Sequence, residues 1–427
     1  MLAILRLASG IVGQVLAGRT LDAELAAAWR RNPRLTAHER ATIQDAGYGV
    51  LRHLGRIDAM IEALLQKPLT DERLRQLLRV AMYELEYTRV APHAVVDHAV
   101  QACVVLGLPH AKGLVNAVLR NFQRQHQRVA AAAERSDVGR YSHPQWWIDR
   151  LRSEQPAHWR QMLETGNAHP PLTLRVNRRR RARDEYLARL AAEGVAAHAV
   201  GGDGVVLESP CPVDRIPGFG AGDVSVQDAS AQLAAPLLDV APGQRVLDAC
   251  SAPGGKAAHI LERADVSLLA LDNDEARIER IKSNFARLAL EASVLCGDAA
   301  DPRSWWDGKP YDRILADVPC SASGVVRRHP DIKWLRRPED IGGFAVRQAA
   351  ILDALWQLLG RDGKLLYATC SVFQEENSLQ IARFLERHPD ARRIDPPGAD
   401  NTLQEPAGQI RPDRDHDGFF YALLQKA

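Results

Sequence analysis

"RVLDACSAPGGKAAHILERADVSLLALD", residues 245–272, has the pattern of a buried strand, a glycine-rich turn, a helix and a second buried strand. The alternation continues downstream, where we expect further strands over 293–298, 312–320, 363–370 and 418–424. Alternating strands and helices predict a parallel sheet with helices on both faces. In such a sheet the ligand crevice lies beyond the carboxyl ends of the strands.

The composition is typical of a globular protein. The chain has 427 residues, of which 46% are hydrophobic and 25% charged, and its formal net charge is only +2. Any basic surface for a nucleic acid must therefore be local. The six cysteines show no CxxC spacing, which argues against a disulfide framework or a structural zinc site and favours reduced thiols in the cytoplasm. No apolar run reaches the roughly 18 residues that span a membrane. We therefore expect a cytoplasmic protein with no bound metal and no membrane partner.

Three domains are expected along the chain. Residues 1–140 show helical periodicity almost throughout and predict an all-α bundle. Residues 141–222 mix short strand and helix patterns and predict a small α+β domain. Residues 223–427 carry the alternating pattern and predict a Rossmann-like α/β domain.

Near the start of the middle domain, the stretch "PLTLRVNRRRRARDEY" is rich in arginine. No acid interrupts Arg175, Arg178, Arg179, Arg180 and Arg181. An isolated charge run of this kind is more often a solvated surface. The alternative is a phosphate-contacting patch, because the arginine guanidinium pairs with phosphate through two hydrogen bonds.

Every strand of the carboxyl-terminal domain is followed by a reactive or charged side chain. A single aspartate at such a position is usually a helix cap, but a succession of them on one edge of a sheet predicts a ligand-binding site. The residues concerned are Asp248, Asp272, Asp298, Asp317, Cys320 and Cys370.

The glycine-rich turn narrows the class of ligand. It fails the phosphate-loop pattern, because Cys250 stands where a glycine is needed, and it does not match G-x-G-x-x-G. Asp272 follows Asp248 by roughly 24 residues, near the spacing at which an acid accepts ribose hydroxyls. A nucleoside cofactor without phosphates points to S-adenosylmethionine, whose positive sulfonium suits a crevice lined by aspartates.

Two thiols beside a methyl donor suggest covalent catalysis. Cytosine C5 is a poor nucleophile, but a thiolate that adds at C6 makes C5 able to attack a sulfonium methyl group. A nearby acid, Asp317, would stabilise the charge that develops at N3. The residues alone do not say whether Cys320 or Cys370 attacks.

Several motifs together resemble one family. "DACSAPGGK", "LDNDEARI", "ADVPCSASGVVRRHPDIKW", "YATCSVFQEEN" and "DGFFYALL" closely resemble the RNA 5-methylcytosine methyltransferases, and within them the bacterial enzymes that act on 16S ribosomal RNA. "VDHAVQACVVLGLPHAKGLVNAVLRNFQR" is similar to helical domains of the NusB type. The resemblance covers essentially the whole chain.

The resemblance implies a role for each thiol. Cys370 resembles the family's nucleophile, and Cys320 resembles the cysteine that assists proton removal and product release. Ser251 and Val318 depart slightly from the commonest family sequence, where alanine is frequent. S-adenosylhomocysteine would be the product, and the implied cofactor-binding positions are Cys250, Ser251, Ala252, Pro253, Gly254, Gly255, Lys256, Asp272, Asp298 and Asp317.

The resemblance also implies that the partner is 16S ribosomal RNA and that the arginine run grips phosphates. Arg327, Arg328, His329 and Lys333 would extend this surface beyond Cys320. Trp334 could stack on a base or anchor the fold. The helical bundle could hold RNA or act as a scaffold. We expect a monomer.

Two rival functions share these features. One is methylation of transfer RNA or another RNA by the same core. The other is an RNA-binding assembly factor with an inactive core, which would show no stabilisation by S-adenosylmethionine. The intact Cys320, Cys370, Asp317 and cofactor turn favour an active enzyme.

Overall fold

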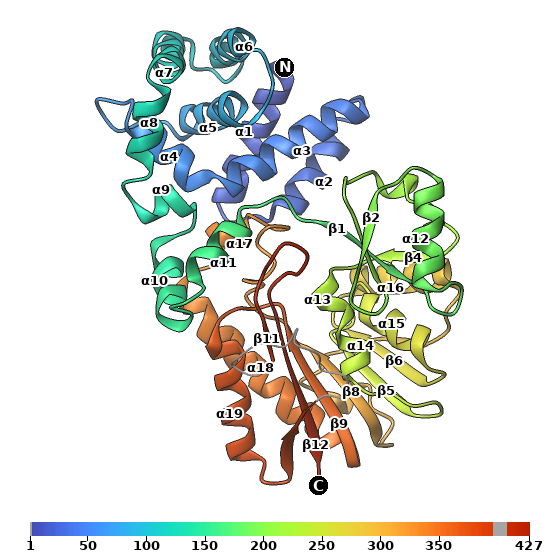
Figure 1. Ribbon diagram of the computed structural model, residues 1–427. Helices are drawn as coiled ribbons and strands as arrows, with labels where there is room; N and C mark the ends of the chain where they lie inside the picture. The colour runs from blue at the N-terminus through green and yellow to red at the C-terminus, as the bar shows by residue number, and fades with distance from the viewer. Residues whose placement is uncertain (1, 396–407) are drawn as a thin grey trace. The chain divides into compact units, whose positions relative to one another are not determined.

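The computed structural model describes residues 2–395 and 408–427. These residues form two compact units (Figure 1). The first comprises Met1–His169 with Val326–Pro338, and the second comprises Pro170–Val325 with Glu339–Ala427.

The first unit is helical, which confirms the predicted all-α bundle. Leu74, Leu77, Leu78 and Ala81 are buried on one face of α5, and the Asp71 side chain caps this helix by accepting hydrogen bonds from two backbone N–H groups. The elements are α1 Leu2–Leu16, α2 Leu21–Arg31, α3 Ala37–Arg52, α4 Leu54–Glu62, α5 Glu72–Tyr87, α6 Pro92–Val105, η1 Pro109–Ala111, α7 Lys112–Arg124, α8 His126–Ala133, α9 Asp137–Tyr141, α10 Gln145–Glu154, α11 Trp159–Gly166 and α17 Ile332–Leu335.

The segment Val326–Pro338 belongs to this helical unit although it follows the Cys320 motif in sequence. The Lys333 ammonium donates hydrogen bonds to the Arg52 carbonyl oxygen (2.8 Å), the Ser142 carbonyl oxygen (2.9 Å) and the Asn167 side-chain oxygen (2.8 Å). The Trp334 indole donates to the Leu51 carbonyl oxygen at 2.7 Å and packs on the helical core, so Trp334 is an anchor of the fold.

The second unit begins with a four-stranded antiparallel sheet in the order β2-β3-β1-β4. Leu174, Val176, Tyr186 and Leu190 lie in its core, where α12 packs on the sheet. This is the predicted small α+β fold, and β4 lies just beyond residue 222, where we expected the domain to end. The elements are β1 Leu172–Val176, α12 Arg183–Ala192, β2 Ala197–Val200, β3 Gly204–Leu207, η2 Val213–Arg215 and β4 Val224–Val226.

A larger sheet follows, in the order β10-β12-β9-β8-β5-β6-β7 with β11 paired to β12. Strands β5 to β9 are parallel, as predicted. Its elements are α13 Ala229–Gln232, α14 Ala234–Leu237, β5 Arg245–Ala249, α15 Gly255–Arg263, β6 Ser267–Asp272, α16 Glu275–Leu288, β7 Ser293–Cys296, η3 Pro302–Ser304, β8 Tyr311–Asp317, α18 Pro338–Leu358, β9 Leu359–Thr369, η4 Gln374–Glu376, α19 Ser378–Arg387, β10 Ala391–Ile394, β11 Gln409–Ile410 and β12 Phe419–Lys426.

The expectation of a purely parallel sheet was wrong at one edge. Strand β12 lies between β9 and β10 and runs antiparallel to both. Strand β12 also pairs antiparallel with β11, to which a short connection joins it, as antiparallel neighbours allow.

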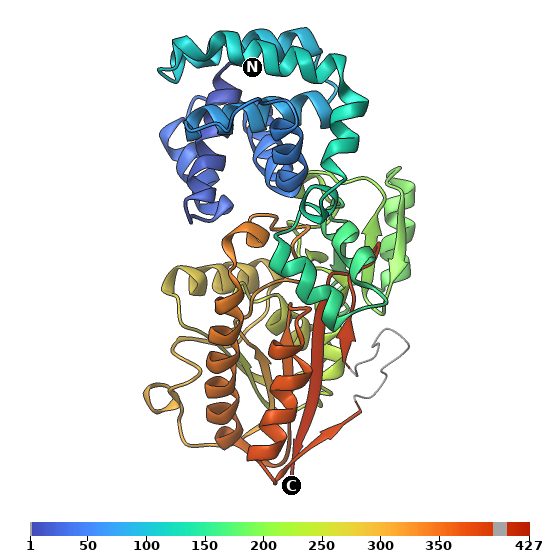
Figure 2. The same cartoon turned by 90° about the vertical axis from the view of Figure 1, so that its left-hand side faces the viewer.

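Helices cover both faces of the large sheet, as Figures 1 and 2 show for α15 and α16 on one face and α18 and α19 on the other. Alternate residues of each strand face the two cores. Leu366 and Ala368 of β9 pack with α15 and α16, whereas Leu365 and Tyr367 pack with α18 and α19. This arrangement leaves the carboxyl ends of the parallel strands as the open edge.

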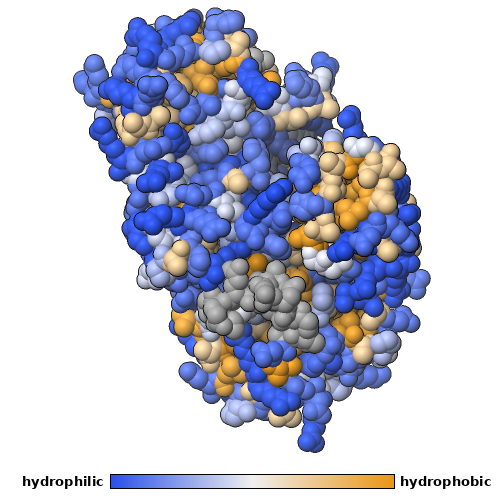
Figure 3. Space-filling view, viewed as in Figure 1, coloured by the Kyte–Doolittle hydropathy of each residue, from blue (hydrophilic) through white to orange (hydrophobic). Residues whose placement is uncertain are grey.

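The face of the protein seen in Figure 3 is dominated by hydrophilic residues, with apolar side chains in small separate groups. Within residues 2–395 and 408–427, none of the helices has the length and apolarity needed to cross a bilayer.

We predict that Lys333→Met loosens the helical unit. The change leaves three buried oxygen acceptors without their donor, and each such loss costs about 1–3 kcal/mol. Hydrogen exchange of the amides in α3 and α17 should therefore quicken at least about tenfold. Lys112→Met, on an exposed position of α7, is the control and should leave the exchange unchanged. Unchanged exchange in Lys333→Met would show that the ammonium does not hold this segment.

Candidate active site

The carboxyl ends of β5 to β9 enclose a cavity of about 240 Å³. The structure brings together most of the predicted site, since the lining includes Cys250, Asp272, Asp298, Asp317, Cys320 and Cys370. Five of the six strand-end residues singled out in the sequence therefore share one crevice, whereas Asp248 is fully buried and does not line it.

The cofactor turn reaches this cavity through Cys250 and Ala252. Ser251, Pro253, Gly254, Gly255 and Lys256 fall outside its lining and shape the turn instead. Gly254 has a φ of +91°, in the left-handed region that favours glycine, and the turn there leads directly into α15.

The turn is tied to the neighbouring strand. The Ala252 backbone N–H donates to the Asp272 carboxylate at 3.0 Å, and the Ser251 backbone N–H donates to the Leu271 carbonyl oxygen at 2.8 Å. The Asp272 side chain is only 2% exposed at the end of β6. This carboxylate therefore has a fixed position at the cavity wall.

Each of the three cavity aspartates has a cation beside it. Arg277 lies 3.3 Å from Asp272, Arg347 contacts both carboxylate oxygens of Asp298 at 2.8 and 2.9 Å, and the Lys256 ammonium lies 2.6 Å from Asp317. Burial alone would lower the pKa of Lys256, but the contact with Asp317 raises it above its usual range, so Lys256 carries a positive charge.

This set of donors and acceptors fits S-adenosylmethionine. Carboxylates accept hydrogen bonds from ribose hydroxyls, and their charge favours a sulfonium cation. Asp272 and Asp298 would hold the nucleoside, and the backbone of the turn at Ala252 would face it. Arg277 and Arg347, which also line the cavity, were missed from the sequence, because no spacing rule marks an arginine on the helix that follows a strand.

The sulfur atoms of Cys320 and Cys370 lie 3.4 Å apart. The reason is the register of the sheet, in which Asp317 at the end of β8 lies opposite Ala368 near the end of β9. A few residues beyond these partners, both cysteines lie at the same point of the crevice. The expectation that both thiols meet at the crevice edge, despite their separation in sequence, is confirmed.

The thiols of the cavity differ in acidity. The hydrogen bond with Cys370, followed by burial, raises the pKa of Cys320 well above its usual range. Burial and the nearby aspartates raise the pKa of Cys250 to about 12. Both groups therefore remain protonated at neutral pH, and Cys250 is a poor nucleophile.

The loop that carries Cys320 also contacts the last strand of the sheet. The Gly324 backbone N–H donates to the Cys370 carbonyl oxygen at 2.8 Å, and the Gly324 carbonyl oxygen accepts from the Gly418 N–H at 2.9 Å. A Cβ atom on Gly324 would lie 2.0 Å from the Gly418 carbonyl oxygen, so only glycine fits there.

The structure contradicts the predicted RNA-contacting role of three residues. Arg175, Arg327 and Lys333 have exposed fractions of 0%, 2% and 0% and cannot reach a phosphate without rearrangement. Arg178, Arg179 and Arg180 are exposed, whereas Arg181, Arg328 and His329 are half-buried. An RNA-contacting role for these six residues stays a prediction.

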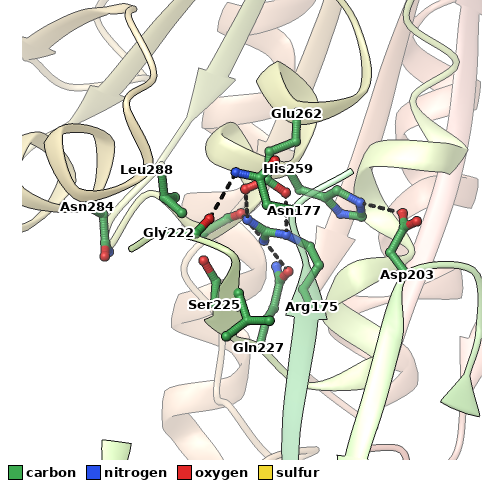
Figure 4. A network of polar contacts seen from close by, with 12 residues as sticks. Arg175, Asn177, Asp203, Gly222, Ser225, Gln227, His259, Glu262, Asn284 and Leu288 are labelled. Carbon is green, nitrogen blue, oxygen red and sulfur yellow. Dashed lines mark hydrogen bonds and ion pairs between the residues drawn. The ribbon is translucent and has the colours of Figure 1, made fainter. Parts of the chain in front are cut away.

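Arg175 has a different role, which Figure 4 shows. Its guanidinium, from β1, donates to both carboxylate oxygens of Glu262 on α15 at 2.9 and 2.8 Å, and to the Gly255 carbonyl oxygen at 2.7 Å. The Gln227 side-chain oxygen also accepts from it. Arg175 therefore ties the small sheet to the helix that begins at the cofactor turn.

The position of Arg175 in its strand explains the error. Residues of β1 from Thr173 to Val176 are buried, and the exposed arginines begin only at Arg178, after the strand has ended. In the sequence, the buried arginine of β1 and the exposed arginines after it form one basic run, so the end of the strand could not be recognised from composition.

Next to Arg175, the imidazole of His259 lies 3.1 Å from the Asp203 carboxylate (Figure 4). Burial lowers the pKa of His259 to about 3, so the imidazole is neutral. Across residues 2–395 and 408–427, no cluster of three or more histidine, cysteine, aspartate or glutamate side chains could hold a metal ion.

Comparisons with known proteins support the same picture. Residues 235–425 match the family described as 16S rRNA methyltransferase RsmB/F, residues 143–214 match its ferredoxin-like domain, and residues 6–124 match the NusB family. The chain is 45% identical over 425 residues to ribosomal RNA small subunit methyltransferase B of Vibrio cholerae, which covers 98% of this chain and 96% of the relative. The chain belongs to the 16S rRNA methyltransferase RsmB/F family.

Other relatives agree with this assignment. Ribosomal RNA small subunit methyltransferase B of Pseudomonas putida is 44% identical over 428 residues, with 98% of this chain and 96% of the relative covered. A solved methyltransferase homologue from Pyrococcus horikoshii has a TM-score of 0.59 at 25% identity and covers 68% of this chain and 97% of its own. The solved structure of PH0851 shares the fold over 100% of this chain and 99% of its own, with a TM-score of 0.80 and 24% identity. This chain therefore combines a NusB domain, a ferredoxin-like domain and a methyltransferase domain.

A buried carboxyl group behind the turn should make stability depend on pH. Burial raises the pKa of Asp248 from 3.8 to about 7, against a hydrogen bond from Ser251 that lowers it. Because the folded protein binds this proton more tightly than the unfolded chain, the contribution of Asp248 to stability is fully present below about pH 4. It is lost as the pH rises through about 7, where Asp248 ionises in the folded state. Asp248→Asn resembles the protonated form and should lose less thermal stability than the wild type between pH 5 and 8.

The matched control is Asp265→Asn, because the Asp265 side chain is 98% exposed. Its melting temperature should follow the wild type across the whole pH range. If Asp248→Asn follows the wild type as well, Asp248 does not titrate in this range.

Proposed function

We propose that this protein transfers a methyl group from S-adenosylmethionine to C5 of a specific cytosine in 16S ribosomal RNA, through a covalent bond between Cys370 and C6. The observation that carries the proposal is the pair of sulfur atoms, 3.4 Å apart, beside Asp317 in a cavity lined by aspartates. Family membership and the names of the relatives support the RNA substrate.

The first step requires a thiolate at Cys370. Its sulfur adds to C6 of the cytosine, and the charge that develops at N3 is neutralised by a proton that the Asp317 carboxyl group donates and takes back when the adduct breaks down. S-adenosylmethionine, when bound, supplies an electrophilic methyl group. The C5 carbon forms a bond to that methyl carbon while the sulfonium–methyl bond breaks, and S-adenosylhomocysteine leaves.

The second step removes the C5 proton. Cys320 accepts this proton, the C5–C6 double bond re-forms, and the S–C6 bond breaks to return the Cys370 thiolate. The contact with Cys370 is the largest cause of the raised pKa of Cys320. As a base in this step, Cys320 must be in its thiolate form, as Cys370 must be in the first step.

The proposed RNA-contacting residues are the described basic residues that remain accessible. These are Arg178, Arg179, Arg180 and Arg181 in the second unit and, separately, Arg328 and His329 in the helical unit. Phosphate contacts of this kind give affinity without sequence readout. The target cytosine must be unpaired or flipped out of a helix to reach the cavity. We propose that the protein acts as a monomer in the cytoplasm and uses no metal.

The test compares the wild type, Cys370→Ala and Cys320→Ala with unmodified small-subunit ribosomal RNA and labelled S-adenosylmethionine. Cys370→Ala should give neither methyl transfer nor adduct, because no sulfur reaches C6. Cys320→Ala should accumulate adduct, because the C5 proton stays in place. Cys296→Ala, an exposed cysteine of β7, is the control and should behave like the wild type.

The opposite pattern, in which Cys320→Ala abolishes the adduct and Cys370→Ala keeps it, would reverse the two roles. Methyl transfer by the wild type to transfer RNA but not to ribosomal RNA would contradict the proposed substrate. A wild type that neither binds S-adenosylmethionine nor is stabilised by it would contradict the enzyme itself.

A further inference from the structure

A buried carboxylate lies between the two cysteine loops and takes no part in the mechanism above. Glu376, in η4, is 0% exposed. One of its oxygens accepts from the Ser321 backbone N–H at 2.7 Å and from the Gln348 amide at 3.1 Å. The other accepts from the hydroxyls of Ser321 and Ser371, each at 2.5 Å.

These partners are the residues next to the two cysteines. Ser321 follows Cys320 and Ser371 follows Cys370, so one carboxylate holds both loops. The Gln348 amide that contacts Glu376 also donates to the Pro319 carbonyl oxygen at 3.1 Å, on the other side of Cys320. The Cys320 loop is therefore fixed before and after its sulfur.

A second layer fixes Glu376 itself. The Tyr367 hydroxyl donates to the backbone carbonyl oxygen of Glu376 at 2.6 Å. The Asn377 side chain accepts from the Thr369 hydroxyl at 2.6 Å and donates to the Ser371 carbonyl oxygen at 2.9 Å. Because Tyr367 and Thr369 lie in β9, the carboxylate is held against the strand that ends at Cys370.

The four described donors to the Glu376 carboxylate are all neutral groups. Its electrostatic effect is one of the causes that raise the pKa of Cys320, after the hydrogen bond to Cys370, burial and the charge of Cys370. The carboxylate thus favours a protonated Cys320 while it holds the loop.

We propose that Glu376 is a positioning residue that sets the spacing of the Cys320 and Cys370 sulfur atoms. The inference rests on the proposed function, because it concerns the same two thiols. Glu376 lies in the stretch "FQEEN", residues 373–377, and not at the end of a strand, so its position in the sequence does not indicate this role.

The experiment uses the full-length protein with S-adenosylmethionine and unmodified small-subunit ribosomal RNA. Glu376→Ala removes four hydrogen bonds, so we expect kcat to fall about 100-fold, as for a reacting group displaced by about 1 Å. The KM for S-adenosylmethionine should change less than about threefold, because Glu376 is not part of the cavity lining.

Glu376→Gln keeps the shape of the side chain and removes its charge, so it tests the proposal even if Glu376→Ala does not fold. Alkylation of Cys320 by iodoacetamide, followed by peptide mass spectrometry across a pH series, should have its midpoint at lower pH in this variant. Glu386→Gln, the same change on an exposed position of α19, is the control and should leave kcat and the alkylation profile unchanged.

The proposal is overturned if Glu376→Ala retains kcat, or if Glu376→Gln leaves the Cys320 profile where it is in the wild type. The wild-type reaction separates this failure from that of the proposed function. If the wild type methylates the RNA and the Glu376 variants do as well, only the inference fails. If the wild type itself does not react, the alkylation profile still tests the effect of Glu376 on Cys320.

Discussion

The contact between the two sulfur atoms depends on a buried carboxylate and on the register of two strands. Strands β8 and β9 are parallel neighbours, and their pairing brings the loops that follow them to the same point of the sheet edge. The pairing of β8 with β9 fixes the backbones of these strands, but it does not fix the side chains of the loops that follow them. Hydrogen bonds from Ser321 and Ser371 to Glu376 supply the remaining constraint and hold both loops in the interior.

Other polar contacts in the methyltransferase domain fix the cavity at the carboxyl ends of the strands. Asp272 and the backbone of the glycine-rich turn hold one wall of the cavity, and the Lys256–Asp317 ion pair links that turn to β8. Arg175 fixes the start of α15 from the small sheet through a fully buried ion pair with Glu262. Breaking a pair of this kind leaves an uncompensated buried charge, so the small domain and the cofactor turn depend on each other.

The sequence was sufficient to predict the parts of the structure that follow from local patterns. Strands over 267–272, 312–320 and 363–370 were expected from apolar runs and correspond to β6, β8 and β9, although β8 ends earlier, at Asp317, and β9 ends at Thr369. The parallel sheet followed from their alternation with helices. The antiparallel course of β12 was not predicted, because the order of strands in a sheet depends on long-range pairing. The order of a helical, an α+β and an α/β domain followed from the same patterns, and the resemblance identified the first as NusB-like. The comparisons support this order.

Burial of charged side chains was the main failure of prediction. The sequence does not distinguish buried Arg175 and Lys333 from solvent-exposed arginines and lysines. Only the fold shows that buried oxygen acceptors bind their side chains. Glu376 was missed for the same reason, since an acid in a loop gives no signal of the hydroxyl groups that reach it from another strand. Polar contacts between residues far apart in sequence cannot be inferred from periodicity.

The account rests on the claim that Cys370 is the sulfur that bonds to the cytosine. RNA containing 5-fluorocytosine tests it directly, because fluorine replaces the C5 proton and the adduct cannot be released. After digestion of the trapped complex with protease and nuclease, mass spectrometry should find the nucleotide on the peptide that contains Cys370. A nucleotide found on the Cys320 peptide would contradict the account, and so would a wild-type enzyme that methylates normal RNA but traps no adduct with the fluorinated one.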